Sequence, residues 1–129
     1  MTLSSHTQPL DDGTTITGTI VFGGTAAVDD TITITDAAGT TKVFTAKAST
    51  SAGDLEFIRT DAAATATALK TCIDNAAGFN ETSITVADDS SGTLTLTLVV
   101  DSTYRFKNKA SIQLMTGITN VTSVDFGGN

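Results

Sequence analysis

The stretch TDAAATATALKTCIDNAAG, residues 60–78, decides the fold, because the rest of the chain mostly alternates threonine with aliphatic residues. Thr60 is expected to cap a helix here, with Asp61 in the first turn, where the helix dipole favours negative charge. Gly78 is expected to end the helix in a left-handed conformation. We therefore predict one α-helix over residues 61–77. Its apolar face would pack on a sheet and comprise Ala62, Ala66, Leu69, Ile73 and Ala76.

Alternating apolar and polar residues predict strands on both sides of this helix. The expected strands are residues 14–22, 31–35, 41–46, 83–87, 93–100, 104–112 and 121–126, with a short extended piece over 54–58. Two pairs of them, 31–35 with 41–46 and 83–87 with 93–100, are separated by turn residues and read as hairpins. Phe44 is expected to point inward and Val43 outward. The predicted fold class is α+β, a mostly antiparallel sheet or sandwich with one helix packed on it.

Length and charge limit the classes of partner. The chain has 129 residues, of which 40% are hydrophobic, and a formal net charge of −7. This length suits a single domain, which we place at residues 14–129 after an arm of residues 1–13. The longest apolar run, residues 98–100, is far too short to cross a membrane. We therefore expect no membrane as partner, and because the net negative charge repels phosphates, we expect no nucleic acid either.

The arm, residues 1–13, offers little apolar material for folding on its own. Apart from the initial methionine, its apolar side chains are Leu3, Pro9 and Leu10. Ordering a residue costs about 1–2 kcal/mol of backbone entropy, so an ordered arm needs a surface to lie on. We expect it to add to the sheet edge of a neighbouring subunit or to lie across a partner protein. Leu3, Pro9 and Leu10 are therefore candidate interaction residues.

A basic segment, YRFKNK at residues 104–109, holds three of the seven positive charges. Strand alternation places Arg105, Lys107 and Lys109 on one face and two aromatic rings on the other. Basic residues interleaved with aromatics can bind single-stranded nucleic acid, but the acidic net charge argues against it. Two interpretations remain open, namely a charged edge strand that discourages aggregation and a basic ridge that contacts an acidic protein neighbour. The three basic residues are candidate interaction residues in the second case.

Groups that could carry out catalysis are sparse. The single histidine, His6, lies in the arm with no nucleophile placed near it. The single cysteine, Cys72, is expected to be a buried thiol on the helix. The sequence has neither a phosphate-binding glycine loop nor a Cys/His cluster for zinc. We therefore predict a protein that is not an enzyme and requires no cofactor.

Paired aspartates are the remaining candidates for metal binding. Carboxylate pairs in turns can collect calcium, although none here has the spacing of an EF-hand loop. Aspartate is also favoured in turns because its side chain accepts hydrogen bonds from the nearby backbone. A turn-forming role is the expectation, and a weak calcium site is the alternative. The pairs are Asp11 with Asp12, Asp29 with Asp30, and Asp88 with Asp89.

Several short segments share a common likeness. They are GTIVF at 18–22, DTITITD at 30–36, ATATAL at 64–69, TLTL at 93–96 and VDFGG at 124–128. Together they resemble a small domain that is common in virion structural proteins of tailed bacteriophages. The resemblance covers about residues 18–128. It departs at residues 104–109, where such domains more often carry small and polar residues.

The resemblance implies a non-enzymatic structural protein of a virus particle. A chain of one domain plus an arm resembles a capsid decoration (cement) protein, which binds the outer shell and stabilises it without covalent bonds. The implied partners are the major capsid protein and copies of the chain itself, a trimer in particular. The implied location is the capsid surface of a virion, with synthesis in the host cytoplasm. The alternatives are a tail or head-fibre component that recognises a host-surface glycan, and a non-viral binding module.

Overall fold

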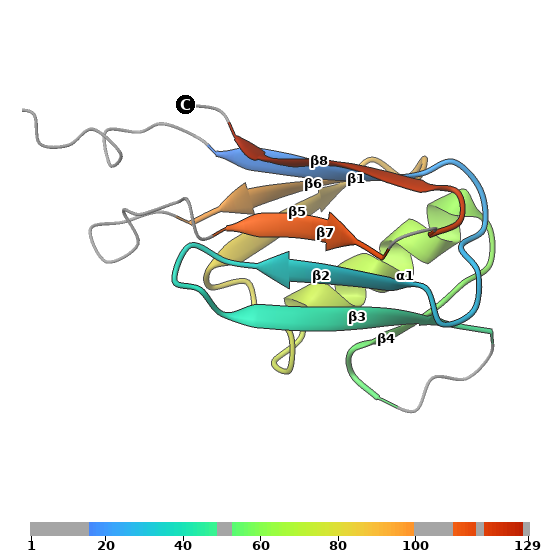
Figure 1. Ribbon diagram of the computed structural model, residues 1–129, viewed down its shortest axis with the longest axis horizontal. Helices are drawn as coiled ribbons and strands as arrows, with labels where there is room; N and C mark the ends of the chain where they lie inside the picture. The colour runs from blue at the N-terminus through green and yellow to red at the C-terminus, as the bar shows by residue number, and fades with distance from the viewer. Residues whose placement is uncertain (1–15, 49–52, 100–109, 116–117, 128–129) are drawn as a thin grey trace, which may run out of the picture.

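The computed structural model describes residues 16–48, 53–99, 110–115 and 118–127 (Figure 1). These residues form one helix and eight strands in two four-stranded sheets, with strand orders β5-β6-β1-β8 and β4-β3-β2-β7. We call them the first and the second sheet. The elements are β1 (Thr17–Phe22), β2 (Thr31–Thr35), β3 (Thr41–Lys47), β4 (Glu56–Ile58), α1 (Ala62–Asp74), β5 (Ile84–Asp88), β6 (Thr93–Leu98), β7 (Ser111–Leu114) and β8 (Val121–Gly127). The predicted α+β, mostly β fold class is confirmed.

The strands follow the alternation that the sequence shows. In β1, β2 and β6 every second residue is buried, and the residues between them are threonines apart from Val21. In β3, Phe44 is fully buried and Val43 is exposed, as predicted. Some boundaries differ from the prediction, since β6 ends at Leu98 rather than at residue 100. Of the predicted strand 104–112, residues 104–109 lie outside the described part of the chain, and β7 spans Ser111–Leu114.

Strand pairing is antiparallel with one exception. The two predicted hairpins are confirmed as β2 with β3 and β5 with β6, and they lie in different sheets. The central strand β1 pairs with β6 and β8, so the first sheet joins the two ends of the described chain. The exception is β4, which pairs with β3 in parallel. The short extended piece expected before the helix is thus an edge strand of the second sheet, anchored by the buried Phe57.

The helix is shorter than predicted at its C-terminal end. It spans Ala62–Asp74, and Asn75 follows in an extended conformation. The Asn75 side chain accepts hydrogen bonds from the backbone N–H groups of Ala77 and Gly78, at 2.7 and 3.0 Å. These local bonds compete with continuation of the helix. Ala76 is consequently exposed, and its predicted place on the apolar face is wrong.

Both predicted helix ends need correction. The N-cap is Asp61, whose carboxylate accepts a hydrogen bond from the Ala64 N–H at 2.8 Å, so the predicted cap at Thr60 is wrong. Gly78 does not adopt the left-handed conformation that was expected of it. It is needed for another reason, because a Cβ there would lie 2.2 Å from the Cys72 carbonyl oxygen and 2.6 Å from that of Ile73.

The core lies between the two sheets and under the helix. The buried helix residues are Thr65, Ala66, Leu69, Cys72 and Ile73. They face β4 of the second sheet and β1, β5 and β6 of the first, so α1 closes one side of the sandwich (Figure 1). The other side is closed by the edge strands β7 and β8, which lie next to each other.

The junction between β7 and β8 is bridged by a side chain rather than by a backbone ladder. The Asp125 Oδ1 atom accepts hydrogen bonds from the N–H of Ile112 in β7 and from the N–H of Phe126, each at 2.8 Å. Beneath the junction, a Cβ on Gly18 would lie 2.7 Å from the Ile112 side chain and 2.9 Å from the Val124 carbonyl oxygen. Only glycine allows the three strands to approach this closely.

Candidate functional site

The residues predicted from sequence to make contacts lie outside the described part of the chain. This holds for Leu3, Pro9 and Leu10 of the arm and for the basic residues Arg105, Lys107 and Lys109. The structure does place the residues to which these segments attach. Ile16, which follows the arm, accepts a hydrogen bond from the Leu98 N–H at 2.9 Å, and Leu98 ends the strand before the basic segment. The arm thus precedes the first sheet in the chain, whereas the basic segment lies between β6 of the first sheet and β7 of the second.

The outer face of the first sheet is uncharged. Its inward residues are buried in the core, and the strand registers align the outward ones in rows that run across β5, β6, β1 and β8. Val124, in the edge strand, is 65% exposed. None of the outward residues carries a charge. We call this surface the threonine face, and its residues are Thr17, Thr19, Val21, Thr85, Ala87, Thr93, Thr95, Thr97, Thr122 and Val124.

The outer face of the second sheet has a different character. It also carries threonines, but Lys47 and Glu56 stand among its outward residues. Lys47 forms an ion pair with Asp29 at 2.8 Å, and this hydrogen bond raises the pKa of the Lys47 ammonium. A charged pair of this kind marks a surface that faces water. The two sheets thus expose chemically different surfaces.

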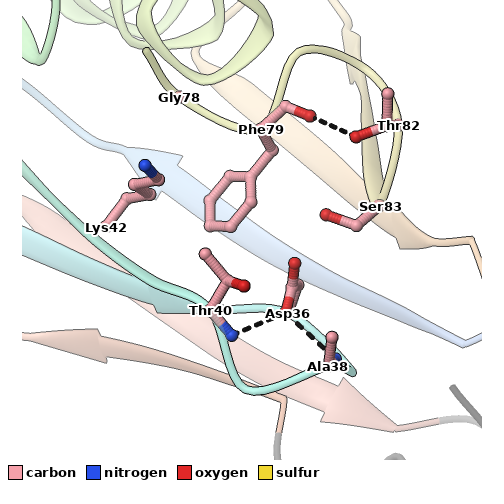
Figure 2. A pocket seen from close by; sticks show the side chains of 8 residues that line it. All are labelled: Asp36, Ala38, Thr40, Lys42, Gly78, Phe79, Thr82 and Ser83. Carbon is pink, nitrogen blue, oxygen red and sulfur yellow. Dashed lines mark hydrogen bonds between the residues drawn. The ribbon is translucent and has the colours of Figure 1, made fainter. Parts of the chain in front are cut away.

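A hollow of about 240 Å³ lies at one end of the sandwich, open to solvent on one side (Figure 2). One wall is the turn between β2 and β3, with Asp36, Thr40 and the start of β3 at Lys42. The other wall is the loop between the helix and β5, with Phe79 and Ser83. The Phe79 ring packs on Phe44 of the core, with ring centroids 6.3 Å apart, and this contact holds Phe79 in place.

Some of the polar side-chain atoms that line this hollow make no hydrogen bond or ion pair with the described residues. Asp36 is only 4% exposed, and its Oδ1 atom accepts hydrogen bonds from the N–H groups of Ala38 and Thr40, at 3.0 and 2.8 Å. In Figure 2 its carboxylate and the Ser83 hydroxyl point toward one another, with Phe79 between them and Lys42. Within the described ranges, neither the second Asp36 oxygen nor the Ser83 hydroxyl has a hydrogen-bond partner, and Lys42 is in no ion pair.

The described aspartate pairs bond to the protein itself. Asp89 Oδ1 accepts from the N–H groups of Ser91 and Thr93, and these bonds lower the pKa of the Asp89 carboxyl. Asp88 accepts from the Ser90 N–H and from the Thr67 hydroxyl. The pair thereby shapes the turn of the second hairpin and ties it to the helix, which is the turn-forming role that was expected.

The pair of Asp29 and Asp30 also bonds to neighbouring groups of the protein. Asp30 is buried and accepts hydrogen bonds from the N–H groups of Ala27 and Thr119, each at 2.9 Å, and Asp29 is paired with Lys47. Among the residues that the structure describes, no three His, Cys, Asp or Glu side chains lie close enough together to hold a metal ion. Asp11 and Asp12 lie outside those residues.

Cys72 is buried, as predicted, and its thiol donates a hydrogen bond to the Glu56 carbonyl oxygen at 3.2 Å. Burial, together with smaller contributions from the nearby carboxylates of Asp54 and Glu56, raises the pKa of this thiol from 9.0 to about 11. A thiol with so high a pKa is protonated at neutral pH and is a poor nucleophile. His6, the other residue considered for catalysis, lies outside the described residues.

Sequence reasoning missed both the threonine face and the hollow. The alternating threonines of β1 and β6 were visible as strand signals, but their assembly with β5 and β8 into one surface depends on the strand order. The hollow joins residues from a turn and a loop that are far apart in the sequence, and no local pattern links them; Asp36 and Ser83 are 47 positions apart.

Comparison with known proteins identifies no relative of this chain: it matches no family model, no curated protein and no solved structure. No helix in the described part of the chain is long and apolar enough to cross a membrane.

Proposed function

We propose that this chain is a non-enzymatic structural protein of a virus particle, which decorates the outer surface of a capsid and stabilises the shell. The virion context rests on the sequence resemblance over residues 18–128. The assembly role rests on one observation of the fold, the threonine face, which is an uncharged sheet surface on a chain with a net charge of −7.

An uncharged face favours contact between like-charged molecules. Copies of a strongly acidic chain repel one another, and burying an unpaired carboxylate in an interface costs several kcal/mol. The centres of protein interfaces are accordingly depleted of charged residues. Threonine hydroxyls, by contrast, can hydrogen-bond across a contact directly or through water. Two copies, or one copy and a capsid protein, can therefore meet on the threonine face without burying a carboxylate from it.

The size of the face limits what it can do alone. Four strands about 4.8 Å apart, each with about six residues at about 3.3 Å per residue, give an area on the order of 400 Å². A stable interface buries about 800 Å² on each partner. The remaining area must come from elsewhere, and the arm with Leu3, Pro9 and Leu10 and the basic segment at Arg105, Lys107 and Lys109 are the proposed sources. The proposed partners are the major capsid protein and copies of the chain, in a closed trimer.

A second candidate is a tail or head-fibre component that recognises a glycan on the host surface. The observation that favours it is the hollow beside Asp36, which is lined by this carboxylate, by Lys42 and by the hydroxyl residues Thr40, Thr82 and Ser83. The two candidates predict different numbers of copies per particle, since a shell has many equivalent positions and a tail has few.

A charge placed on the threonine face tests the assembly role. Thr95 lies in β6, paired on both sides, with Thr19 and with Ala87. In sedimentation velocity experiments and capsid-binding assays we expect Thr95→Lys to weaken self-association and capsid binding at least about tenfold, because an interface would have to bury an unpaired ammonium. The matched control is Thr33→Lys on the outer face of the second sheet, where Thr33 is likewise paired on both sides, with Val43 and with Gln113.

The control variant should associate and bind like the unmodified chain. If Thr95→Lys associates and binds as tightly as Thr33→Lys, the threonine face is not the contact surface. A chain that neither self-associates nor binds capsids would overturn the proposal as a whole.

A further inference from the structure

We propose that the hollow between the β2–β3 turn and the loop after the helix binds the terminal sugar of an uncharged glycan. This deepens the second candidate function, since it names the ligand class and the residues that would hold it. The inference concerns the isolated chain and applies whether the chain sits on a shell or on a tail.

The first argument is the state of the Asp36 carboxylate. Most of the Asp36 side chain is buried, but its second oxygen is open to solvent through the hollow, because the fully buried side-chain atoms that lack a partner in the described ranges are Arg59 Nε and Asp74 Oδ1. Asp36 is 4% exposed, and one of its oxygens serves the turn through Ala38 and Thr40. The other oxygen has no partner in the described ranges and faces the hollow, where Figure 2 shows the Ser83 hydroxyl opposite it. A ligand hydroxyl placed between them would satisfy both.

The second argument is the balance of charges around the hollow. Its lining holds one carboxylate, Asp36, and one ammonium, Lys42, together with the hydroxyls of Thr40, Thr82 and Ser83. The other two described lysines are each paired with an aspartate, Lys47 with Asp29 and Lys70 with Asp74, whereas Lys42 is left free to bind. One negative and one positive group favour a ligand without net charge. Figure 2 shows Phe79 between Lys42 and the pair of Asp36 and Ser83, so hydroxyls from different sides of a sugar ring would reach the two charged groups, one donating to the carboxylate and another accepting from the ammonium.

The third argument is size and shape. A volume of about 240 Å³ lies below the range of about 300–1,000 Å³ typical of pockets for drug-sized ligands, so the hollow accommodates a single sugar ring. The open side lets the rest of a glycan chain remain in solvent. Phe79 lines the hollow but is only 4% exposed and packs on Phe44, so a sugar would be held by polar contacts rather than on an aromatic ring.

The experiment uses the full chain labelled with ¹⁵N and titrated with the methyl glycosides of glucose, galactose, mannose and N-acetylglucosamine, observed by amide NMR. We expect at least one of them to bind with millimolar affinity, as befits a single ring, and to shift the amides of residues 36–42 and 78–83. L-Alanine, a zwitterion without hydroxyls, serves as the competing ligand class and should leave these amides unchanged.

Two substitutions test the assigned groups, and one provides a matched control. Asp36→Asn keeps the turn acceptor but replaces the second oxygen by a donor, and Lys42→Gln removes the ammonium. Each should weaken sugar binding about tenfold, the usual effect of losing a hydrogen bond to a charged group. Asp89→Asn is the control, because Asp89 accepts from the residues two and four positions ahead in its turn, as Asp36 does, but does not line the hollow.

Binding that survives both Asp36→Asn and Lys42→Gln, or that falls equally in Asp89→Asn, would overturn the proposal. So would the absence of any shift with all four glycosides, or shifts at these amides with alanine in their place. Should Asp36→Asn fail to fold, Lys42→Gln still decides, since Lys42 makes no ion pair with the described residues. None of these outcomes bears on capsid binding, so the decoration proposal stands or falls separately.

Discussion

At the scale of single residues, the start of the helix depends on one capping side chain, and the sequence pattern predicted this cap one position too early. Asp61 caps the helix, whereas the Thr60 side chain makes no hydrogen bond with the described residues. We expect Asp61→Ala to lower the free energy of unfolding by about 1 kcal/mol, the usual cost of losing a cap. Thr60→Ala, the adjacent control, should change it by no more than about 0.5 kcal/mol. Urea unfolding of both variants checks this, and equal losses would contradict the cap assignment.

The Cys72 thiol predicts a pH dependence. Its pKa is 9.0 ordinarily and about 11 in the folded chain, so between these values the unfolded chain loses the proton while the folded chain keeps it. The unfolded state is thereby favoured, and the free energy of unfolding falls as pH rises through this window. In Cys72→Ala this contribution is absent, so its stability should decline less steeply from pH 9 to 11 than that of the unmodified chain. Parallel slopes in thermal unfolding scans would contradict the prediction, because they would mean that the thiol has the same pKa in the folded and the unfolded chain.

At the scale of elements, the sequence predicted best what repeats at short range. The alternation of apolar residues predicted which side chains of β1, β2, β3 and β6 point into the core. Successive side chains of a strand point to opposite faces, so only two assignments are possible for each strand. The helix was identified by its apolar face, but its end was overestimated by three residues, because Asn75 makes local backbone bonds that a periodicity argument does not contain.

What the sequence could not supply was the relation between distant elements. The parallel pairing of β4 with β3 involves a strand of three residues, too short to show a pattern. Predicting the threonine face requires the strand order β5-β6-β1-β8, which the sequence does not show. Predicting the hollow requires knowing that the β2–β3 turn lies near the loop after the helix. The arm and the basic segment, predicted from composition, lie outside the described residues, so their contacts remain predictions.

The junction of β7 and β8 makes an element-scale prediction. Asp125 supplies the acceptor that the missing backbone ladder would otherwise provide to the Ile112 N–H. Asp125→Ala leaves this half-buried donor without its partner and should cost about 1–3 kcal/mol. Asp125→Asn keeps the acceptor oxygen and should retain most of the stability. Hydrogen exchange at the Ile112 amide reports the junction directly, and it should quicken in the alanine variant alone. Unchanged exchange in that variant would mean that the two edges are held together by other contacts.

At the scale of the whole molecule, the described strands and helix form a closed core without the arm. We therefore expect deletion of residues 1–13 to leave the thermal unfolding midpoint within a few degrees of that of the full chain. Self-association and attachment to capsids should weaken sharply, because the threonine face alone offers only about half of the area that a stable interface needs. Circular dichroism and sedimentation measure the two effects separately. A truncated chain that attaches as tightly as the full one would exclude the arm, and the basic segment at Arg105, Lys107 and Lys109 would be the next candidate.

The central claim is that this chain belongs to the outer surface of a capsid, and the most direct measurement is its copy number in purified virus particles from its source. Quantitative mass spectrometry gives the ratio of this chain to the major capsid protein. A decoration protein predicts a ratio fixed by the symmetry of the shell, with copies comparable in number to the capsid subunits. A handful of copies per particle would place the chain in a tail or fibre, and its absence from particles would contradict the account.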